Sequence, residues 1–128
     1  GKGGGGGGGS RNNIGTIIYS APEQLQNKGT IASDVWSFGV ILWEMASGKK
    51  PYSDLGTNQV LFGVMFQGLK LEWPTGRHEE LSSLFRRTIA SSPSDRPSFE
   101  EIHKELVYLS KKLKAKNRAA SVAEKGTG

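Results

Sequence analysis

Apolar side chains recur at helical spacing in four separate stretches of this chain. The first, from about Ser33 to Ala46, is apolar on nearly every side, and Ser37 and Glu44 are its main polar positions. Such a helix is typical of the middle of a larger domain, because it has no broad face suited to water. Gly48 and Pro51 follow it, and both residue types are common just after a helix ends. The pattern therefore predicts a buried central helix that stops at Gly48.

Three more helices are predicted after the central one. One runs from near Thr57, the expected N-cap, to Gly68. Another spans about His78 to Ala90, and acidic residues in its first turn suit the positive end of its dipole. The last opens with "SFEE", where Ser98 and Glu101 have the spacing of a capping box. The apolar positions expected to face the core are Val60, Leu61, Val64 and Met65, then Leu81, Leu84, Phe85 and Ile89, and finally Phe99, Ile102, Leu106, Leu109 and Leu113.

Strand patterns are nearly absent. Ile14 to Tyr19 is a short extended candidate at best, and the stretches 15–32 and 69–77 have the composition of long irregular loops. We therefore predict a mainly α fold for the folded part of the chain, about residues 14–110.

The two ends differ from the body in composition. Residues 1–13 contain an unbroken run of seven Gly, which is typical of a disordered linker. A phosphate-cradling loop would need Gly spaced by other residues between a strand and a helix. The net charge is +5, and residues 111–128 hold six Lys or Arg but one Glu, while the rest of the chain has eleven of each sign. We expect 111–128 to be a basic flexible tail that is solvated and frays, with a weak contact to anionic lipid or nucleic acid as the alternative.

The composition excludes several kinds of chemistry. The chain has no Cys, which rules out disulfides, thiolate metal sites and thiol catalysis. His78 and His103 lack partners at metal-ligand spacing, so no metal is expected. No apolar run reaches the roughly 18 residues of a membrane span, and the neutral body argues against a nucleic-acid-binding domain. We expect a cytoplasmic protein and, since residue 1 is Gly rather than Met, a piece of a longer one.

Four short motifs carry a resemblance to a known family. They are "GTIIYSAPE" (15–23), "SDVWSFGVILWEM" (33–45), "GKKPYSD" (48–54) and "PSDRPSFEEI" (93–102). In this order they resemble the end of the activation segment, the buried central helix, the loop after it and the Arg-containing turn before the last helix of eukaryotic protein kinases. The resemblance covers about residues 15–109. It implies an incomplete helical subdomain of the kinase C-terminal lobe.

The resemblance also implies roles for single residues. Its structural motif residues are Ala21, Pro22, Glu23, Asp34, Trp36 and Arg96. Glu23, the last residue of A-P-E, is implied to form an ion pair with Arg96; the alternative is two unrelated surface charges. Asp34 is implied to orient the catalytic loop of an intact kinase, whereas within this chain alone a helix cap is the favoured role.

The subgroup is indicated by two kinds of feature. "SFGVILWEM" and "RPSFEEI" resemble tyrosine-kinase-like and tyrosine kinases, while Gly15-Thr16 ahead of A-P-E resembles serine/threonine kinases, in which this Thr contacts the catalytic Asp. An ordinary loop role for Thr16 is the alternative. Together these features suggest a tyrosine-kinase-like serine/threonine kinase, with Gly15, Thr16 and Tyr19 positioning the protein substrate.

The motifs that perform phosphoryl transfer are missing from these 128 residues. There is no Gly-rich loop, V-A-I-K-like strand, H-R-D-L-x-x-x-N or D-F-G. We therefore expect no catalytic or cofactor-binding residue in the chain, and ATP and Mg²⁺ only in an intact parent kinase. The expected partners are the missing N-terminal part of the kinase domain and a protein substrate. The alternative function is a non-catalytic, kinase-derived interaction module.

Overall fold

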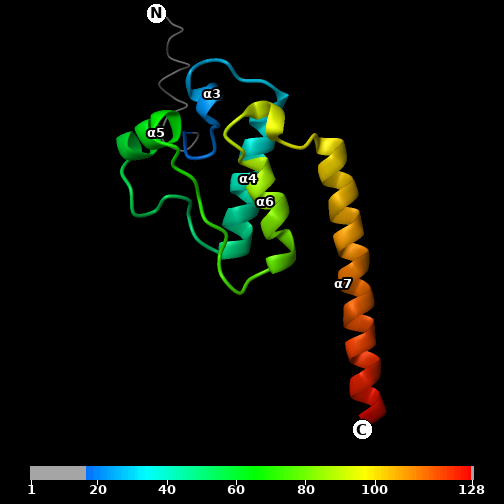
Figure 1. The fold of residues 1–128 in the computed structure, drawn as a ribbon. Coiled ribbons are helices and arrows are strands. Elements are labelled where there is room, and N and C mark those ends of the chain that lie inside the picture. The colour runs from blue at the N-terminus through cyan, green and yellow to red at the C-terminus, as the bar shows by residue number, and fades with distance from the viewer. Residues whose placement is uncertain (1–16, 128) are drawn as a thin grey trace, which may run out of the picture. The chain divides into compact units, whose positions relative to one another are not determined.

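The computed structural model describes residues 17–127, which divide into one unit up to Pro97 and a second from Ser98 onward (Figure 1). Within this part of the chain there is no strand, which confirms the mainly α prediction. The elements in order are α3 (Pro22–Leu25), α4 (Ile31–Ser47), α5 (Thr57–Phe66), the 3-10 helix η1 (Glu79–Leu81), α6 (Ser82–Thr88), the 3-10 helix η2 (Pro93–Asp95) and α7 (Phe99–Thr127).

Helix α4 is the predicted central helix. It begins after Thr30, whose backbone N–H donates to the Ser33 hydroxyl at 3.0 Å. It ends at Gly48, which adopts the left-handed conformation at φ 70° and donates its N–H to the Glu44 carbonyl. Gly tolerates this conformation because it has no Cβ. The core around α4 contains Ala21, Trp36, Val40, Leu42, Val60, Val64, Phe85 and Ile89.

Helices α4 and α6 pack side by side (Figure 1). Gly39 makes this close approach possible, since a Cβ at this position would lie 2.1 Å from Thr88 Oγ1. Thr88 is fully buried, and its hydroxyl donates to the Phe85 carbonyl at 2.6 Å. The missing side chain of Gly39 therefore lets the two helix backbones approach closely. The Thr88 hydroxyl can be buried between them because it has a hydrogen-bond partner within α6.

Helix α5 matches its predicted position but not its predicted cap. The N-cap is Gly56, and the Gln59 side chain accepts from the Gly56 N–H at 2.7 Å, so Thr57 is already the first helical residue. Among the predicted core positions, Val60 and Val64 are buried and the other two are half-buried. The helix stops at Phe66, just before the left-handed Gly68.

The predicted helix over 78–90 is shorter in the structure and has two parts. His78 is left-handed at φ 46°, η1 follows it, and α6 ends at Thr88. The preceding loop, 69–77, is irregular as predicted. Two indole N–H groups hold this loop: Trp43 donates to the Glu72 carbonyl at 2.7 Å, and Trp73 donates to the Arg77 carbonyl at 2.8 Å.

The region before α4 differs from its prediction. Ile17 is helical and Ile18 and Tyr19 form a turn, so these residues are not extended, and Ser20 donates its N–H to the Ile17 carbonyl at 3.0 Å. The predicted loop 15–32 contains α3, which starts at Pro22. Proline suits the first turn of a helix because its fixed φ is helical and the missing N–H would have no intrahelical partner. The predicted linker 1–13 lies outside the described residues.

Helix α7 opens with the predicted capping box. The Ser98 N–H donates to Glu101 Oε1 at 2.9 Å, and the Glu101 N–H donates to the Ser98 hydroxyl at 3.1 Å. The helix continues through the predicted tail to Thr127. None of the helices in the described part of the chain is long and apolar enough to cross a bilayer.

Candidate functional site

A buried ion pair joins two residues that are far apart in sequence. Arg96 Nη1 lies 2.7 Å from Glu23 Oε2, and Arg96 Nη2 lies 3.1 Å from Glu23 Oε1. The Arg96 side chain is 0% exposed and that of Glu23 is 15% exposed. This two-bond geometry matches the planar guanidinium to the carboxylate. The pairing expected from the kinase resemblance is therefore present.

Arg96 also donates hydrogen bonds to two backbone carbonyl groups. Its Nε donates to the Ala90 carbonyl and its Nη1 to the Ala32 carbonyl, each at 2.9 Å. Its guanidinium lies 5.1 Å from the centre of the Trp36 ring, within the range of a cation–π contact. One side chain therefore connects α3, the first turn of α4 and the loop after α6.

Ser33 completes the environment of the Glu23 carboxylate. Its hydroxyl donates to Glu23 Oε2 at 2.6 Å while accepting from the Thr30 N–H. Partial burial alone raises the pKa of Glu23, but the hydrogen bonds from Arg96 and Ser33 outweigh it, and the pKa lies below its ordinary value. The carboxylate is therefore ionised at neutral pH. The Ser33 contact was not predicted from the sequence, in which the available signal was a Ser at the start of an apolar helix.

A second anchor holds the turn that precedes α3. The Tyr19 hydroxyl donates to Glu44 Oε1 at 2.7 Å, and the Ser37 hydroxyl donates to the Tyr19 carbonyl at 2.7 Å. The hydrogen bond to Glu44, followed by burial, raises the pKa of Tyr19. Ser37 and Glu44 are the two polar positions noted on the apolar helix. Their contacts were not predicted.

The remaining predicted site residues fall into three groups. Ala21 is fully buried and is the N-cap of α3, and Pro22 begins that helix. Trp36 is buried beneath Arg96, and its indole N–H has no hydrogen-bond partner within the described part of the chain. Gly15 and Thr16 lie outside the described residues.

The helix-cap interpretation of Asp34 is wrong. Asp34 lies in the first turn of α4, after the N-cap Thr30, and it is exposed. Ser33, not Asp34, provides the side-chain oxygen that binds the Thr30 N–H. An exposed carboxylate at this point leaves Asp34 accessible to another chain segment.

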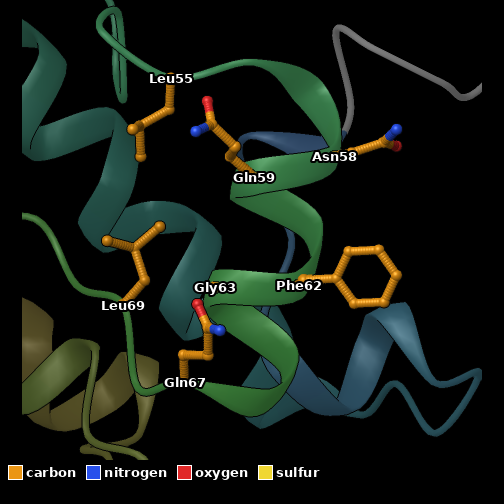
Figure 2. Close-up of a pocket in the computed structure, with 7 residues that line it drawn as sticks. All are labelled: Leu55, Asn58, Gln59, Phe62, Gly63, Gln67 and Leu69. Atoms are coloured by element: carbon orange, nitrogen blue, oxygen red, sulfur yellow. The ribbon is translucent and has the colours of Figure 1, made fainter.

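A groove of about 610 Å³ borders α5 (Figure 2). Leu55 and Leu69 approach it from the flanking loops, Gln59 extends from the helix, and Gln67 extends from its C-cap (Figure 2). Its lining residues are Leu55, Asn58, Gln59, Phe62, Gly63, Gln67 and Leu69, none of them charged. Phe62 and Phe66 are 53% and 65% exposed, and their ring centres lie 6.1 Å apart.

The comparisons with known proteins agree with this architecture. The family model described as protein tyrosine and serine/threonine kinase matches residues 9–106. The chain therefore belongs to the protein kinase family, and the motifs it carries are those of the helical C-terminal lobe. The described residues include no group of three or more His, Asp or Glu that could hold a metal ion.

Similar proteins include tyrosine-protein kinases and mitogen-activated protein kinase kinase kinases. The chain is 45% identical over 89 residues to the tyrosine-protein kinase transforming protein Abl of Abelson murine leukemia virus. The aligned region covers 68% of the chain and 12% of the viral protein. It is 37% identical over 89 residues to mitogen-activated protein kinase kinase kinase 13-B of Xenopus laevis, covering 69% of the chain and 9% of that protein. Human tyrosine-protein kinase ABL2 is 43% identical over 89 residues, and the aligned region covers 68% of the chain and 7% of ABL2. The chain thus spans about a tenth of the length of these relatives.

Proposed function

We propose that this chain is the substrate-side, helical part of a serine/threonine kinase domain of the tyrosine-kinase-like group. The observation that carries the proposal is the pair of anchors on α4. The Glu23–Arg96 pair fixes the end of the A-P-E segment, and the Tyr19–Glu44 bond fixes the turn before it. A segment held at two points against a buried helix suits a surface that must position a peptide for reaction.

The proposed role of the chain is to position the protein substrate. Gly15, Thr16 and Tyr19 orient the protein substrate, and Glu23, Arg96 and Trp36 keep that segment in place. The choice of serine/threonine over tyrosine rests on Gly15-Thr16 ahead of A-P-E. The similarity to mitogen-activated protein kinase kinase kinase 13-B supports the same group.

Phosphoryl transfer itself is proposed to depend on a partner segment. The described residues offer neither a Gly-rich phosphate loop nor a group of three or more His, Asp or Glu that could hold Mg²⁺, so we place neither ATP nor its metal on them. We assign both to the N-terminal part of the kinase domain in the parent protein, which we place in the cytoplasm. The chain alone is not competent for catalysis.

One exposed face of α4 is suited to contact this N-terminal part of the kinase domain. Ile31 and Met45 are each 73% exposed and Ile41 is 45% exposed, although α4 is the central helix of its unit. Together with Asp34 these residues recur at intervals of three, seven and four, which places them along one face of the helix. An apolar face with one exposed carboxylate suits the missing part of the lobe, with Asp34 accepting hydrogen bonds from its backbone.

A chimera tests the proposal. Residues 15–109 replace the corresponding segment of the viral Abl protein, and the product, here called the Abl chimera, is assayed on matched peptides with Ser, Thr or Tyr as the acceptor. We expect ATP-dependent phosphorylation with a shift toward Ser or Thr. A folded, ATP-binding chimera that phosphorylates no peptide would refute the positioning role. Tyr phosphorylation without Ser or Thr phosphorylation would refute the proposed specificity.

A non-catalytic interaction module is the second candidate function, favoured by the groove at α5. No charged residue or His occurs in residues 55–69, and Phe62 and Phe66 are exposed there. An uncharged, apolar groove suits an uncharged partner segment with apolar anchor side chains. An inactive chimera, combined with binding of such a peptide that Phe62→Lys abolishes, would favour this function over the kinase role.

A further inference from the structure

The second half of α7 carries the net charge of the protein on a single exposed helix. Lys111, Lys112, Lys114, Lys116 and Arg118 lie within eight residues. No Asp or Glu occurs at positions 106–123, so near neighbours along the helix do not neutralise these cations. Residues 110–123 are all exposed. The kinase proposal assigns no role to this segment.

The cations share a helix face with apolar side chains. Tyr108, Ala115 and Val122 recur at intervals of seven residues, and Lys111 and Arg118 lie between them at intervals of three and four. The structure agrees with this spacing, because Ala115, Arg118, Ala119, Val122 and Ala123 line one shallow hollow. Lys112 Nζ also lies 5.9 Å from the centre of the Tyr108 ring.

Two members of this face are apolar or aromatic and yet exposed. Tyr108 is 61% exposed and Val122 is 66% exposed. Tyr favours the boundary between water and hydrocarbon, because its ring is apolar and its hydroxyl is polar. Long Lys and Arg side chains can place their charges at lipid headgroups while their methylene groups cover apolar surface.

We propose that residues 108–123 of α7 form a peripheral membrane-binding helix that lies on an anionic phospholipid surface. Helices that bind in this way have basic residues beside apolar ones and low overall hydrophobicity. Each Lys or Arg near an anionic membrane surface contributes attraction, and five of them act together here. Nucleic acid attracts the same cations, but single-strand binding also uses several aromatic platforms. This face offers Tyr108 as its aromatic residue, and Ala115, Ala119 and Val122 would add nothing to phosphate contacts.

Flotation of vesicles in a density gradient tests the proposal with the full chain. The vesicles are phosphatidylcholine alone or phosphatidylcholine mixed with phosphatidylserine. Flotation separates bound protein from any aggregate, because an aggregate sediments. We expect binding that requires phosphatidylserine and that falls when the ionic strength rises from about 0.1 M to about 0.5 M, since salt screens the attraction.

A charge-matched pair of variants makes the test specific. The tail variant is Lys111→Glu, Lys112→Glu and Arg118→Glu, and it retains helix-forming residues at every changed position. The control is Lys28→Glu, Lys49→Glu and Lys70→Glu, three exposed positions in the first unit with the same change in net charge. We expect the tail variant to lose roughly a hundredfold in vesicle partitioning and the control to stay within roughly threefold.

Three results would overturn the proposal. One is the absence of binding to phosphatidylserine vesicles at low salt. Another is an equal loss in both triple variants, which would mean attraction by net charge alone. The third is tighter binding to a mixed-sequence single-stranded RNA than to the vesicles, which would assign the face to nucleic acid. In contrast, a weaker partitioning of Tyr108→Ala with all cations retained would support insertion of the ring at the interface.

Discussion

The A-P-E segment and the groove at α5 both border the core around α4, but different interactions form them. The first is held by buried charge and hydrogen bonds: Glu23 has partners in Arg96 and Ser33, and Arg96 has additional backbone partners. The second is lined by uncharged residues from α5 and its flanking loops. Directional bonds fix one geometry, whereas apolar contacts allow a surface to adapt. This difference suits the two proposed roles, substrate positioning by the A-P-E segment and partner binding at the groove.

The largest expected effect comes from removing one partner of the buried ion pair. Arg96→Ala leaves the Glu23 carboxylate without its cation and frees the carbonyl groups of Ala32 and Ala90. We expect a loss of about 3–5 kcal/mol in the free energy of unfolding, the usual cost of breaking a buried pair. Chemical denaturation of the Abl chimera measures it.

The control for this prediction is another arginine of the same unit. Arg86 is exposed, and Arg86→Ala should change the free energy of unfolding by less than about 0.5 kcal/mol. Equal stability of the Arg96 and Arg86 variants would mean that the ion pair does not hold the A-P-E segment.

The second effect concerns the packing of α4 against α6. In Gly39→Ala the new methyl group would lie 2.1 Å from Thr88 Oγ1 and 3.0 Å from Thr88 Cβ, so the buried Thr88 side chain or the two helices must shift. We expect a loss of about 1–3 kcal/mol, the range for overpacked cores. Gly29→Ala is the matched control, because the nearest atom to its new Cβ, Gln24 Cγ, lies 3.5 Å away. A stability for Gly39→Ala no lower than that of Gly29→Ala, in the same denaturation assay, would show that the helices adjust freely.

Much of the fold was predictable because it depends on patterns within single elements. The apolar run of α4, the Gly48 stop and the Ser98–Glu101 capping box are all local signals, and each appears in the structure. Helix α3 was missed because four residues are too few to show periodicity. Pro22 at its first position was the available signal.

The candidate site was predictable only where a family motif named both partners. Glu23 and Arg96 are 73 positions apart, and nothing in their local sequences pairs them. The Tyr19–Glu44 bond depends on which side of α4 faces the preceding turn, and spacing alone does not determine that. The cap role of Asp34 failed because Thr30 starts the helix earlier, and the hydroxyl of Ser33 then reaches the Thr30 N–H.

A smaller effect should follow from pH, through the carboxylate of Glu23. Its pKa is lower in the folded state than in the unfolded chain, so the ionised form stabilises the fold. This contribution is complete above the unfolded pKa of about 4.3 and is lost as the pH falls through the lower, folded value. Stability of the Abl chimera should therefore fall more steeply in acid than that of its Glu23→Gln variant. If the free energy of unfolding fell equally steeply in both proteins below about pH 4.3, the acid sensitivity would belong to other carboxyl groups.

The smallest stability effect should come from the second anchor, where one hydrogen bond is removed without changing the packing. Tyr19→Phe deletes the hydroxyl that donates to Glu44, and the half-buried carboxylate can still be hydrated. We expect a loss of about 1 kcal/mol in the free energy of unfolding, typical of a single hydrogen bond. The kinetic effect should be the larger one, with a lower kcat/KM of the Abl chimera for peptides, because the turn before A-P-E loses its side-chain bond to α4. Tyr108→Phe, on the exposed face of α7, is the matched control and should leave peptide kinetics unchanged. If Tyr19→Phe lowered stability but left kcat/KM at the control value, the Tyr19–Glu44 bond would be structural, and positioning would rest on the Glu23–Arg96 pair alone.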